Sequence, residues 1–441
     1  MRRHPLDSLD RRIIAIAIPA LGSLLVEPIY ILTDTAIVGH LGTDPLGGLA
    51  LASTVLNTVV WVFNFLSYGT TVRVAVRRGR GDLDGAAADA LQALWLAVGI
   101  GLAMALVVGL GARGLLGVLG DDPAVIDQGA TYLRISAVGI PFQFVTVACI
   151  GYLYGLPDAT RPFIVAASAN VINLVLELVL VFGLDRGIGG SAWGTVIAQM
   201  SSAAAMLALV VPRLRRDGLH RLVVVPRVMW EVVKVGAHLV QRTAFLLAAL
   251  AVATATASKV GTDDLAGHQI AAQLFLFLAI GVDMFKVAGQ SLVGHALGSG
   301  DRAAARDVVD HLWRWGWRVG GGLTIVTLAL SPVLPLMFSR DGDVIAAARI
   351  ALVILGLMQV PAAITFVLDG VLMGSNDFRD LRWQTTLAFA VSLPLFAVVY
   401  LRPSLGIAGV WAAMFVWIAV RAVKNGQRVR GDAWMDGADR V

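Results

Sequence analysis

The chain has 441 residues, of which 57% are hydrophobic and only 15% are charged. Soluble domains carry about 25% charged residues, so this composition excludes an ordinary soluble protein and predicts a membrane protein. The formal net charge of +5 comes from basic residues between the apolar stretches. Contact with anionic membrane lipid explains these residues better than nucleic-acid binding does, so we expect lipid and no nucleic acid among the partners.

Apolar stretches of about 20 residues, each long enough to cross the hydrocarbon layer as a helix, recur along the chain. No segment of about ten residues alternates with a period of two, which argues against a membrane β-barrel. We predict an all-α polytopic membrane protein with twelve spans at 13–36, 46–69, 88–111, 131–155, 163–184, 189–211, 233–257, 265–290, 316–338, 348–373, 384–401 and 406–424.

Most Lys and Arg residues lie in the N-terminal segment and in every second loop, for example in 2–12, 73–80 and 213–227. The positive-inside rule therefore predicts that both termini are cytoplasmic. The first apolar stretch is too long for a cleavable signal peptide, so we interpret it as an uncleaved first span. Abundant Arg and Ala beside few Lys indicate a bacterial origin, and the expected location is the bacterial cytoplasmic (inner) membrane.

The chain repeats itself at a constant offset of 219 residues. Gly-Thr-Asp occurs at 42–44 and again at 261–263, and Gly-Ile occurs at 187–188 and again at 406–407. No gap is needed across most of each half. Two similar bundles in one membrane chain are a common plan of secondary transporters.

A polar stretch at 212–232 is the longest between spans. We predict that it is a cytoplasmic linker between an N-lobe, 1–211 with spans 1–6, and a C-lobe, 233–441 with spans 7–12. The two lobes would be pseudo-symmetric six-helix bundles that move relative to each other.

Ionisable residues inside spans are candidate functional residues, because a charge in hydrocarbon is expensive. Glu27 and Asp34 lie two helical turns apart on the first span, with Pro28 between them, so they should face the same direction. Asn173 and Glu177 lie one turn apart on the fifth span. Removing water from a buried acid favours its neutral form, so a proton could bind and leave near neutral pH.

Asn170 lies one turn before Asn173, and Thr195 contributes a hydroxyl from the sixth span. Carboxylate, amide and hydroxyl oxygens suit a proton or a small cation. The sequence therefore predicts a site for a coupling ion, H⁺ or Na⁺, at Asp34, Asn173, Glu177 and Thr195. The open alternative is that these groups only bridge helices by hydrogen bonds.

The repeat places Ala253 at the position of Asp34 and Phe396 at the position of Glu177. The acidic site therefore exists in one half only. If these acids served helix packing alone, the second half should need something similar, so we expect ion coupling in the N-lobe.

The second half carries Asp283 and Lys286 at a spacing that lets them pair, and Asp369 near a helix end. Each has a structural alternative and a functional one, in which it contacts substrate. Arg242 lies near the cytoplasmic end of the seventh span, and we expect it to extend toward water. The candidates for substrate binding or gating are Glu27, Pro28, Asn170, Asp283, Lys286 and Asp369.

Signatures of soluble enzymes are missing from the sequence. It contains no Gly-Lys-Ser/Thr nucleotide-binding loop and no His-Glu-x-x-His metal motif, so we expect neither an enzyme nor an ATP-driven pump. We expect no cofactor and no metal other than a coupling Na⁺.

Several segments together resemble multidrug and toxic compound extrusion (MATE) transporters, most of all their DinF-like branch. They are 19–42, which ends in DTAIVGHLG, 61–70 (WVFNFLSYGT), 267–273 (GHQIAAQ) and 368–374 (LDGVLMG). The resemblance covers roughly 10–425, and the ordered set is fairly specific although no single motif is diagnostic.

This resemblance implies two six-helix lobes with a cleft near the membrane middle. It also implies an antiporter that expels organic, often cationic or amphipathic compounds, driven by inward H⁺ or Na⁺. Asp34 matches the family's protonation residue, and Asn173, Glu177 and Thr195 match its polar cluster. Some relatives have Asp where this chain has Glu177, which leaves the ion open. Lys286 stands where a small residue is expected, and it would disfavour cationic substrates.

We therefore predict a monomeric multidrug efflux antiporter that works by alternating access. The alternative is a lipid-linked precursor flippase of the same superfamily. Such flippases line the cleft with several basic residues, for which only Arg242 and Lys286 qualify here.

Overall fold

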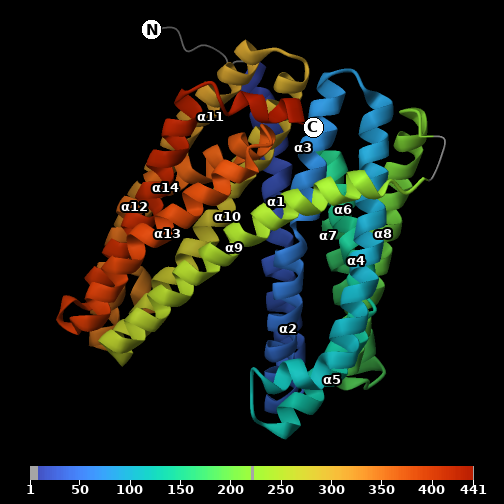
Figure 1. Cartoon of the computed structure of the whole chain (residues 1–441). Coiled ribbons are helices and arrows are strands. Elements are labelled where there is room, and N and C mark those ends of the chain that lie inside the picture. The colour runs from blue at the N-terminus through green and yellow to red at the C-terminus, as the bar shows by residue number, and fades with distance from the viewer. Residues whose placement is uncertain (1–7, 220–222, 441) are drawn as a thin grey trace. The chain divides into compact units, whose positions relative to one another are not determined.

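The computed structural model describes residues 8–219 and 223–440, and these residues are almost entirely helical (Figure 1). No strand occurs within these two ranges. Ten helices are long and apolar enough to cross a membrane, and α5 (Pro123–Ala137) with α6 (Ile140–Gly155), bent by 52° at their junction, form an eleventh candidate. The predicted all-α membrane fold is confirmed.

The N-terminal unit comprises Ile18–Gly236. Within it α4 packs against α5 and α6, and α8 packs against α5, α6 and α7. Besides α5 and α6, the helices of this unit, coloured from blue to green in Figure 1, are α2 (Thr43–Phe63), α3 (Phe65–Gly79), α4 (Leu83–Gly117), α7 (Thr160–Glu177) and α8 (Gly187–Arg216).

The C-terminal unit comprises the chain from Ala237 onward together with the described residues up to Ala17. Its central helix, α12, packs against α10, α11 and α14, and most of its residues are buried. The helices of this unit are α10 (Thr262–Gly298), α11 (Arg302–Leu330), α12 (Gly342–Gly374), α13 (Phe378–Leu401) and α14 (Gly406–Arg430), with short 3₁₀ turns at Leu334–Met337, Pro403–Leu405 and Met435–Arg440.

Two long helices are shared between the units. Helix α1 (Ser8–Gly39) belongs to the C-terminal unit up to Ala17 and to the N-terminal unit from Ile18. In the early part of α1, Asp10 accepts a hydrogen bond from the indole Nε1 of Trp315, 3.0 Å away, on α11. Helix α9 (Pro226–Val260) changes units after Gly236.

The sequence repeat also appears in the structure, because equivalent helices begin at equivalent residues of the two halves. Helices α2 and α10 begin 219 residues apart, and so do α4 and α11, α5 and α12, and α8 and α14. The equivalent residues Asp82 and Asp301 each accept a hydrogen bond from the backbone N–H three residues later, at 2.9 and 2.8 Å. Before each of them a glycine takes the left-handed conformation, Gly81 at φ +76° and Gly300 at φ +77°.

Equivalent glycines also bring equivalent helices together. A Cβ atom on Gly151 of α6 would lie 2.6 Å from the carbonyl oxygen of Ser67 on α3. A Cβ atom on Gly370 of α12 would overlap the carbonyl oxygen of Lys286 on α10. Small residues allow membrane helices to approach closely, so the same contact has been built in both halves.

The halves differ where helices are interrupted. Asn64 separates α2 from α3, whereas the equivalent residue, Asp283, lies inside the continuous helix α10. Helix α7 ends at Glu177 and continues as a π-helical segment (Leu178–Gly183), whereas the equivalent helix α13 is continuous. Segments of π-helix are frequent at functional sites, and here one follows a candidate residue.

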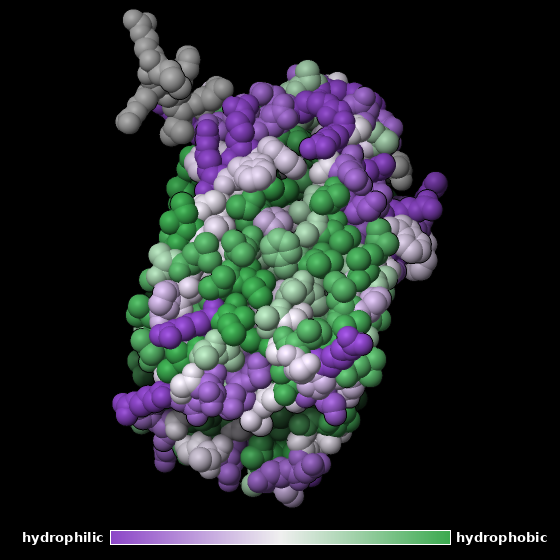
Figure 2. Space-filling model, turned by 90° about the vertical axis from the view of Figure 1, so that its left-hand side faces the viewer, coloured by the Kyte–Doolittle hydropathy of each residue, from purple (hydrophilic) through white to green (hydrophobic). Residues whose placement is uncertain are grey.

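The predicted span 316–338 differs from the structure at both ends. It falls on α11, which begins earlier, at Arg302, and ends at Leu330. The charged residues of its first half continue to Arg318, which explains why α11 is not among the ten apolar helices. On the face drawn in Figure 2, hydrophobic residues form a broad band and hydrophilic residues gather mainly at its two ends, as expected for a surface in lipid.

The polar stretch between the halves is partly helical. Helix α8 continues to Arg216, and α9 begins at Pro226. Gln92 of α4 donates a hydrogen bond to the carbonyl oxygen of Val223 and accepts one from the N–H of Val225, both at 2.8 Å. The end of this stretch is therefore fastened to the N-terminal unit. The lobe limits 1–211 and 233–441 remain a prediction.

We predict that Gly151→Ala and Gly370→Ala each lower the free energy of unfolding by about 1–3 kcal/mol, because a backbone carbonyl cannot move aside for the added methyl group. The controls are Gly99→Ala and Gly321→Ala, where nothing lies within 4 Å of the added atom. Unfolding of purified protein in detergent, followed by tryptophan fluorescence, measures the difference. Equal stability of all four variants would contradict the close helix contacts.

Candidate functional site

Asp34 of α1 is buried, with 4% of its surface exposed. One carboxylate oxygen accepts a hydrogen bond from the Ser191 hydroxyl of α8 at 2.5 Å, and the other accepts one from the Tyr132 hydroxyl of α5 at 3.2 Å. Hydroxyl groups from two helices therefore hold this acid. Hydroxyl donors stabilise a carboxylate without adding the full charge of a basic partner, so they leave it able to take up a proton.

The predicted polar residues of α7 and α8 lie in the same cluster. The Asn173 amide nitrogen donates to Glu177 Oε1 at 3.0 Å and to Thr195 Oγ1 at 3.5 Å. The Thr195 hydroxyl also shares a hydrogen bond of 2.8 Å with the hydroxyl of Tyr30 on α1. Glu177 is fully buried and lies close enough to Asp34 to interact with it electrostatically. We call these residues the acid cluster: Tyr30, Asp34, Tyr132, Asn173, Glu177, Ser191 and Thr195.

Two oxygen atoms of the acid cluster have unused hydrogen-bonding capacity. Glu177 Oε2 and Asn173 Oδ1 are buried, and neither has a hydrogen-bond partner among the described residues. Leaving a buried acceptor unsatisfied costs about 1–3 kcal/mol. A proton on Glu177 or a small cation beside both oxygens would remove this cost.

The other predicted residues of the first half lie outside the acid cluster. Glu27 was expected to face the same direction as Asp34, but it is exposed and does not share the buried environment of Asp34. Pro28 is partly buried inside the uninterrupted helix α1. The Asn170 amide donates to the carbonyl oxygen of Val26 at 3.2 Å and so links α7 to α1.

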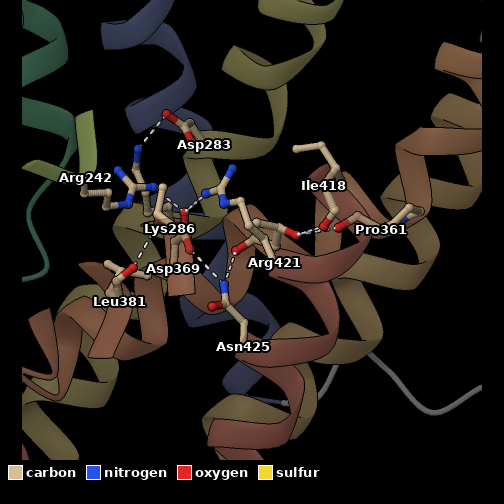
Figure 3. A network of polar contacts seen from close by, with 11 residues as sticks. Arg242, Asp283, Lys286, Pro361, Asp369, Leu381, Ile418, Arg421 and Asn425 are labelled. Carbon is tan, nitrogen blue, oxygen red and sulfur yellow. Dashed lines mark hydrogen bonds and ion pairs between the residues drawn. The ribbon is translucent and has the colours of Figure 1, made fainter. Parts of the chain in front are cut away.

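The C-terminal unit contains a second buried group of charges, drawn in Figure 3. Asp369 of α12 is fully buried and forms an ion pair with Arg242 of α9. It also accepts hydrogen bonds from Arg421 and Asn425 of α14, both at 2.8 Å. The expectation that Arg242 extends toward water is wrong: its surface is only 7% exposed, because Asp369 holds it inside the bundle.

The predicted pairing of Asp283 with Lys286 is present on α10, with the Lys286 ammonium 2.6 Å from the carboxylate. Lys286 is buried, whereas the Asp283 side chain is 24% exposed. Figure 3 shows this pair beside Arg242 and Asp369. We call the group the ion-pair cluster: Arg242, Asp283, Lys286, Asp369, Arg421 and Asn425.

Three residues of the acid cluster were not predicted. Tyr30 precedes Asp34 by four residues and Ser191 precedes Thr195 by four, so helical spacing could have identified both. Tyr132 has no such signal, because its contact with Asp34 joins helices that are far apart in the sequence.

Two residues of the ion-pair cluster were also missed. Arg421 lies inside the predicted span 406–424 and should have counted as an intramembrane charge. Asn425 follows it by one helical turn, just beyond that span.

The family model described as MatE matches this chain twice, at residues 19–179 and 242–402. Protein DETOXIFICATION 44, chloroplastic, of Arabidopsis thaliana is 30% identical over 446 residues, which cover 96% of this chain and 83% of that protein. DNA damage-inducible protein F of Escherichia coli (strain K12) is 27% identical over 430 residues, which cover 95% of this chain and 91% of that protein.

Among solved structures, the Vibrio cholerae MATE transporter VcmN in its bent form has the same fold, with a TM-score of 0.88. It is 18% identical, and the match covers 98% of each chain. The two matches of the family model agree with the internal repeat, since each falls on one half of the chain.

We predict that Asp369→Asn lowers the free energy of unfolding by about 3–5 kcal/mol, because it leaves Arg242 and Arg421 buried together without a counter-charge. The matched control is Asp432→Asn, which breaks an exposed pair with Arg306 and should cost less than about 1 kcal/mol. Unfolding in detergent compares the two variants. A loss no larger for Asp369→Asn than for Asp432→Asn would contradict the ion-pair cluster.

Proposed function

The chain belongs to the MatE family of multidrug efflux transporters, and we propose that it is a secondary active antiporter coupled to inward H⁺ or Na⁺ through the acid cluster. The observation that carries this proposal is the burial of Asp34 and Glu177 together among hydroxyl and amide partners. Two such acids are a poor choice for packing alone, but they are suited to binding and releasing a cation.

The hydrogen bonds of Asp34 connect ion binding to helix movement. In its charged form the carboxylate accepts strong hydrogen bonds from Ser191 and Tyr132, and these fasten α1 to α8 and α5. A proton removes the charge and weakens both bonds. Helix α1 is then free to bend near Pro28, whose ring leaves the helix without one backbone hydrogen bond. We propose that this bending displaces the substrate as the lobes change their access.

The energy available per proton is sufficient for export. One charge moving through 100 mV releases about 2.3 kcal/mol, and one pH unit adds about 1.4 kcal/mol. Together they support a substrate gradient of roughly a few hundred-fold per proton.

The same residues offer oxygen ligands to Na⁺. Asp34, the free Glu177 Oε2 and Asn173 Oδ1 atoms and the Thr195 hydroxyl supply carboxylate, amide and hydroxyl oxygens. The proposal therefore has two versions, one with H⁺ and one with Na⁺ as the coupling ion. The two versions differ in which residues of the acid cluster are needed to bind the ion.

The protein is a multi-pass membrane protein, and we propose the bacterial inner membrane with both termini in the cytoplasm. The distribution of basic residues between the spans supports this orientation. The proposed cargo is small organic, amphipathic compounds, and the proposed working form is a monomer.

We predict that Asp34→Asn abolishes gradient-driven efflux, because the amide cannot take up the coupling proton. The measurement is efflux of a fluorescent cationic dye and, in parallel, a fluorescent carboxylate dye from proteoliposomes, with a pH gradient or a Na⁺ gradient. The control is Asp127→Asn, an exposed acid of the same unit that pairs with Arg113.

Full pH-driven efflux by Asp34→Asn would contradict this mechanism. Failure of the wild-type protein to move either dye under either gradient would favour the flippase instead.

We predict that Thr195→Val keeps pH-driven efflux within about tenfold of the wild type, since it removes neutral hydrogen bonds but no titratable group. With Na⁺ as the coupling ion, the same change removes a ligand and should raise the Na⁺ concentration that gives half-maximal efflux. Initial rates at a series of Na⁺ concentrations distinguish the two cases. Loss of pH-driven efflux in Thr195→Val would contradict coupling by protons on the acids alone.

A further inference from the structure

Polar atoms with unused hydrogen-bonding capacity continue beyond the acid cluster in the N-terminal unit. They are the hydroxyl of Ser136 on α5, the hydroxyl of Thr146 on α6 and the amide oxygen Oε1 of Gln199 on α8. All three atoms are buried, and none has a hydrogen-bond partner in the part of the chain that the structure describes. Buried polar groups normally have a partner, which is often an ordered water molecule. The three atoms therefore indicate places where water binds.

Two of these residues lie one helical turn from the acid cluster. Ser136 follows Tyr132 by four residues on α5, and Gln199 follows Thr195 by four residues on α8. Four residues advance about 6 Å along a helix. A water molecule that makes two hydrogen bonds of about 2.8 Å each spans nearly this distance. One water is therefore sufficient to bridge one turn.

Gln199 reaches the bend between α5 and α6. A Cβ atom on Gly139 would overlap Gln199 Oε1 and would lie 3.2 Å from the carbonyl oxygen of Ser136, so all three residues meet at the bend. The helices are bent by 52° here, and Pro141 contributes to the bend because it has no backbone N–H for the carbonyl oxygen of Ala137. The bend thus brings further polar backbone to the place where Ser136 and Gln199 meet.

The equivalent contact in the C-terminal unit is built from apolar residues. Leu355 of α12 and Ile418 of α14 occupy the positions of Ser136 and Gln199 in the repeat, and both side chains are fully buried. Helix packing at this contact therefore does not require polar side chains. The polar pair occurs in the unit that also holds the acid cluster, which favours a role for the pair in ion coupling.

Thr146 extends the series beyond the bend. It lies on α6, seven residues or about two helical turns after Gly139, and α6 packs against α8. Its counterpart in the repeat, Thr365, donates its hydroxyl hydrogen to the carbonyl oxygen of Pro361 at 2.8 Å, a common bond of threonine inside a helix. The Thr146 hydroxyl makes no such bond among the described residues, so it is available to a water molecule.

We propose that Ser136 and Gln199 bind water at the bend between α5 and α6, and that this water carries the coupling proton from the acid cluster toward the cytoplasmic end of α8. The inference rests on the H⁺ version of the proposed function and on the proposed orientation. An acid of the cluster gives its proton to the water, while the water gives one of its own protons to the next water, beside Thr146. The acid thereby regains its negative charge, and no net charge stays on the first water.

The direct test is a crystal structure of the full-length protein at a resolution that shows ordered water. We expect water within hydrogen-bond distance of Gln199 Oε1 and of the Ser136 hydroxyl. Gln199→Leu, which has a similar volume but no polar side-chain atom, should lose the water at position 199. Absence of water from the bend of the wild-type protein would overturn the proposal, whether or not the protein couples efflux to protons.

The functional test is the initial rate of pH-driven dye efflux from proteoliposomes by Ser136→Ala and by Gln199→Leu. Each variant should lower the maximal rate about tenfold, because a hydrogen-bonding group that orders the water is lost. The dye concentration that gives the half-maximal rate should not change, since neither residue is proposed to contact the dye. Replacing H₂O by D₂O should slow the variants more than the wild type, because proton movement becomes the slow step.

The matched controls are Thr131→Val on α5 and Ser201→Ala on α8. Both hydroxyls form exposed hydrogen bonds with backbone carbonyl oxygens of their own helices, at 2.9 and 2.8 Å, so both controls should transport as the wild type does. Ser136 and Gln199 lie on different helices, so one variant decides the question if the other fails to fold. Wild-type rates and isotope effects in Ser136→Ala and Gln199→Leu would overturn the water path.

The outcomes separate the water path from the proposed function. Failure of the wild-type protein to couple efflux to a pH gradient would contradict the proposed H⁺ antiport and leave the path without a proton to carry. Intact pH-driven efflux in the wild type, with both variants unaffected, would contradict only the path. Equal slowing of pH-driven and Na⁺-driven efflux by the variants would indicate disturbed packing rather than proton movement, and it would also overturn the path.

Discussion

The cost of placing a charge in a membrane governs both sites of this protein. Each unit buries ionisable side chains, and each offsets the cost in a different way. Asp34 in the N-terminal unit is stabilised by hydroxyl groups, which allows its charge to change. Asp369 in the C-terminal unit is fixed by two arginines, which hold its charge constant. The hydroxyl partners of Asp34 support the proposed exchange of a cation in the N-terminal unit, whereas Asp369 in the C-terminal unit is paired with arginines.

The repeat makes this difference easy to see, because four pairs of helices begin at equivalent residues in the two halves. Asp34 corresponds to Ala253, which has no charge. In the opposite direction, Asp369 corresponds to Ile150 and Arg421 to Ser202. Each half thus carries its charges at positions where the other is neutral. Helix starts and glycine contacts are shared between the halves, which differ in these side chains and in where their helices are interrupted.

The sequence was sufficient for everything that depends on local pattern. The length of the apolar stretches predicts the membrane helices, and the constant offset between the halves predicts that these helices form two similar sets. Asp34, Asn173, Glu177 and Thr195 could be singled out because a buried acid in hydrocarbon has few structural explanations. What could not be predicted depends on packing between distant helices. The hydroxyl of Tyr132 reaches Asp34 only because α5 lies against α1 there. The exposure of Glu27 was missed for the same reason, since helical spacing gives a direction but not the neighbour found in that direction.

The sharing of α1 and α9 between the units has a consequence for how the protein is made. The residues from Ser8 to Ala17 are synthesised before the N-terminal unit, yet they belong to the unit whose other helices are synthesised after it. Asp10 can meet Trp315 only after about three hundred further residues have been translated. The C-terminal unit therefore cannot be completed before its later helices are translated, and its earliest segment stays incompletely packed until then.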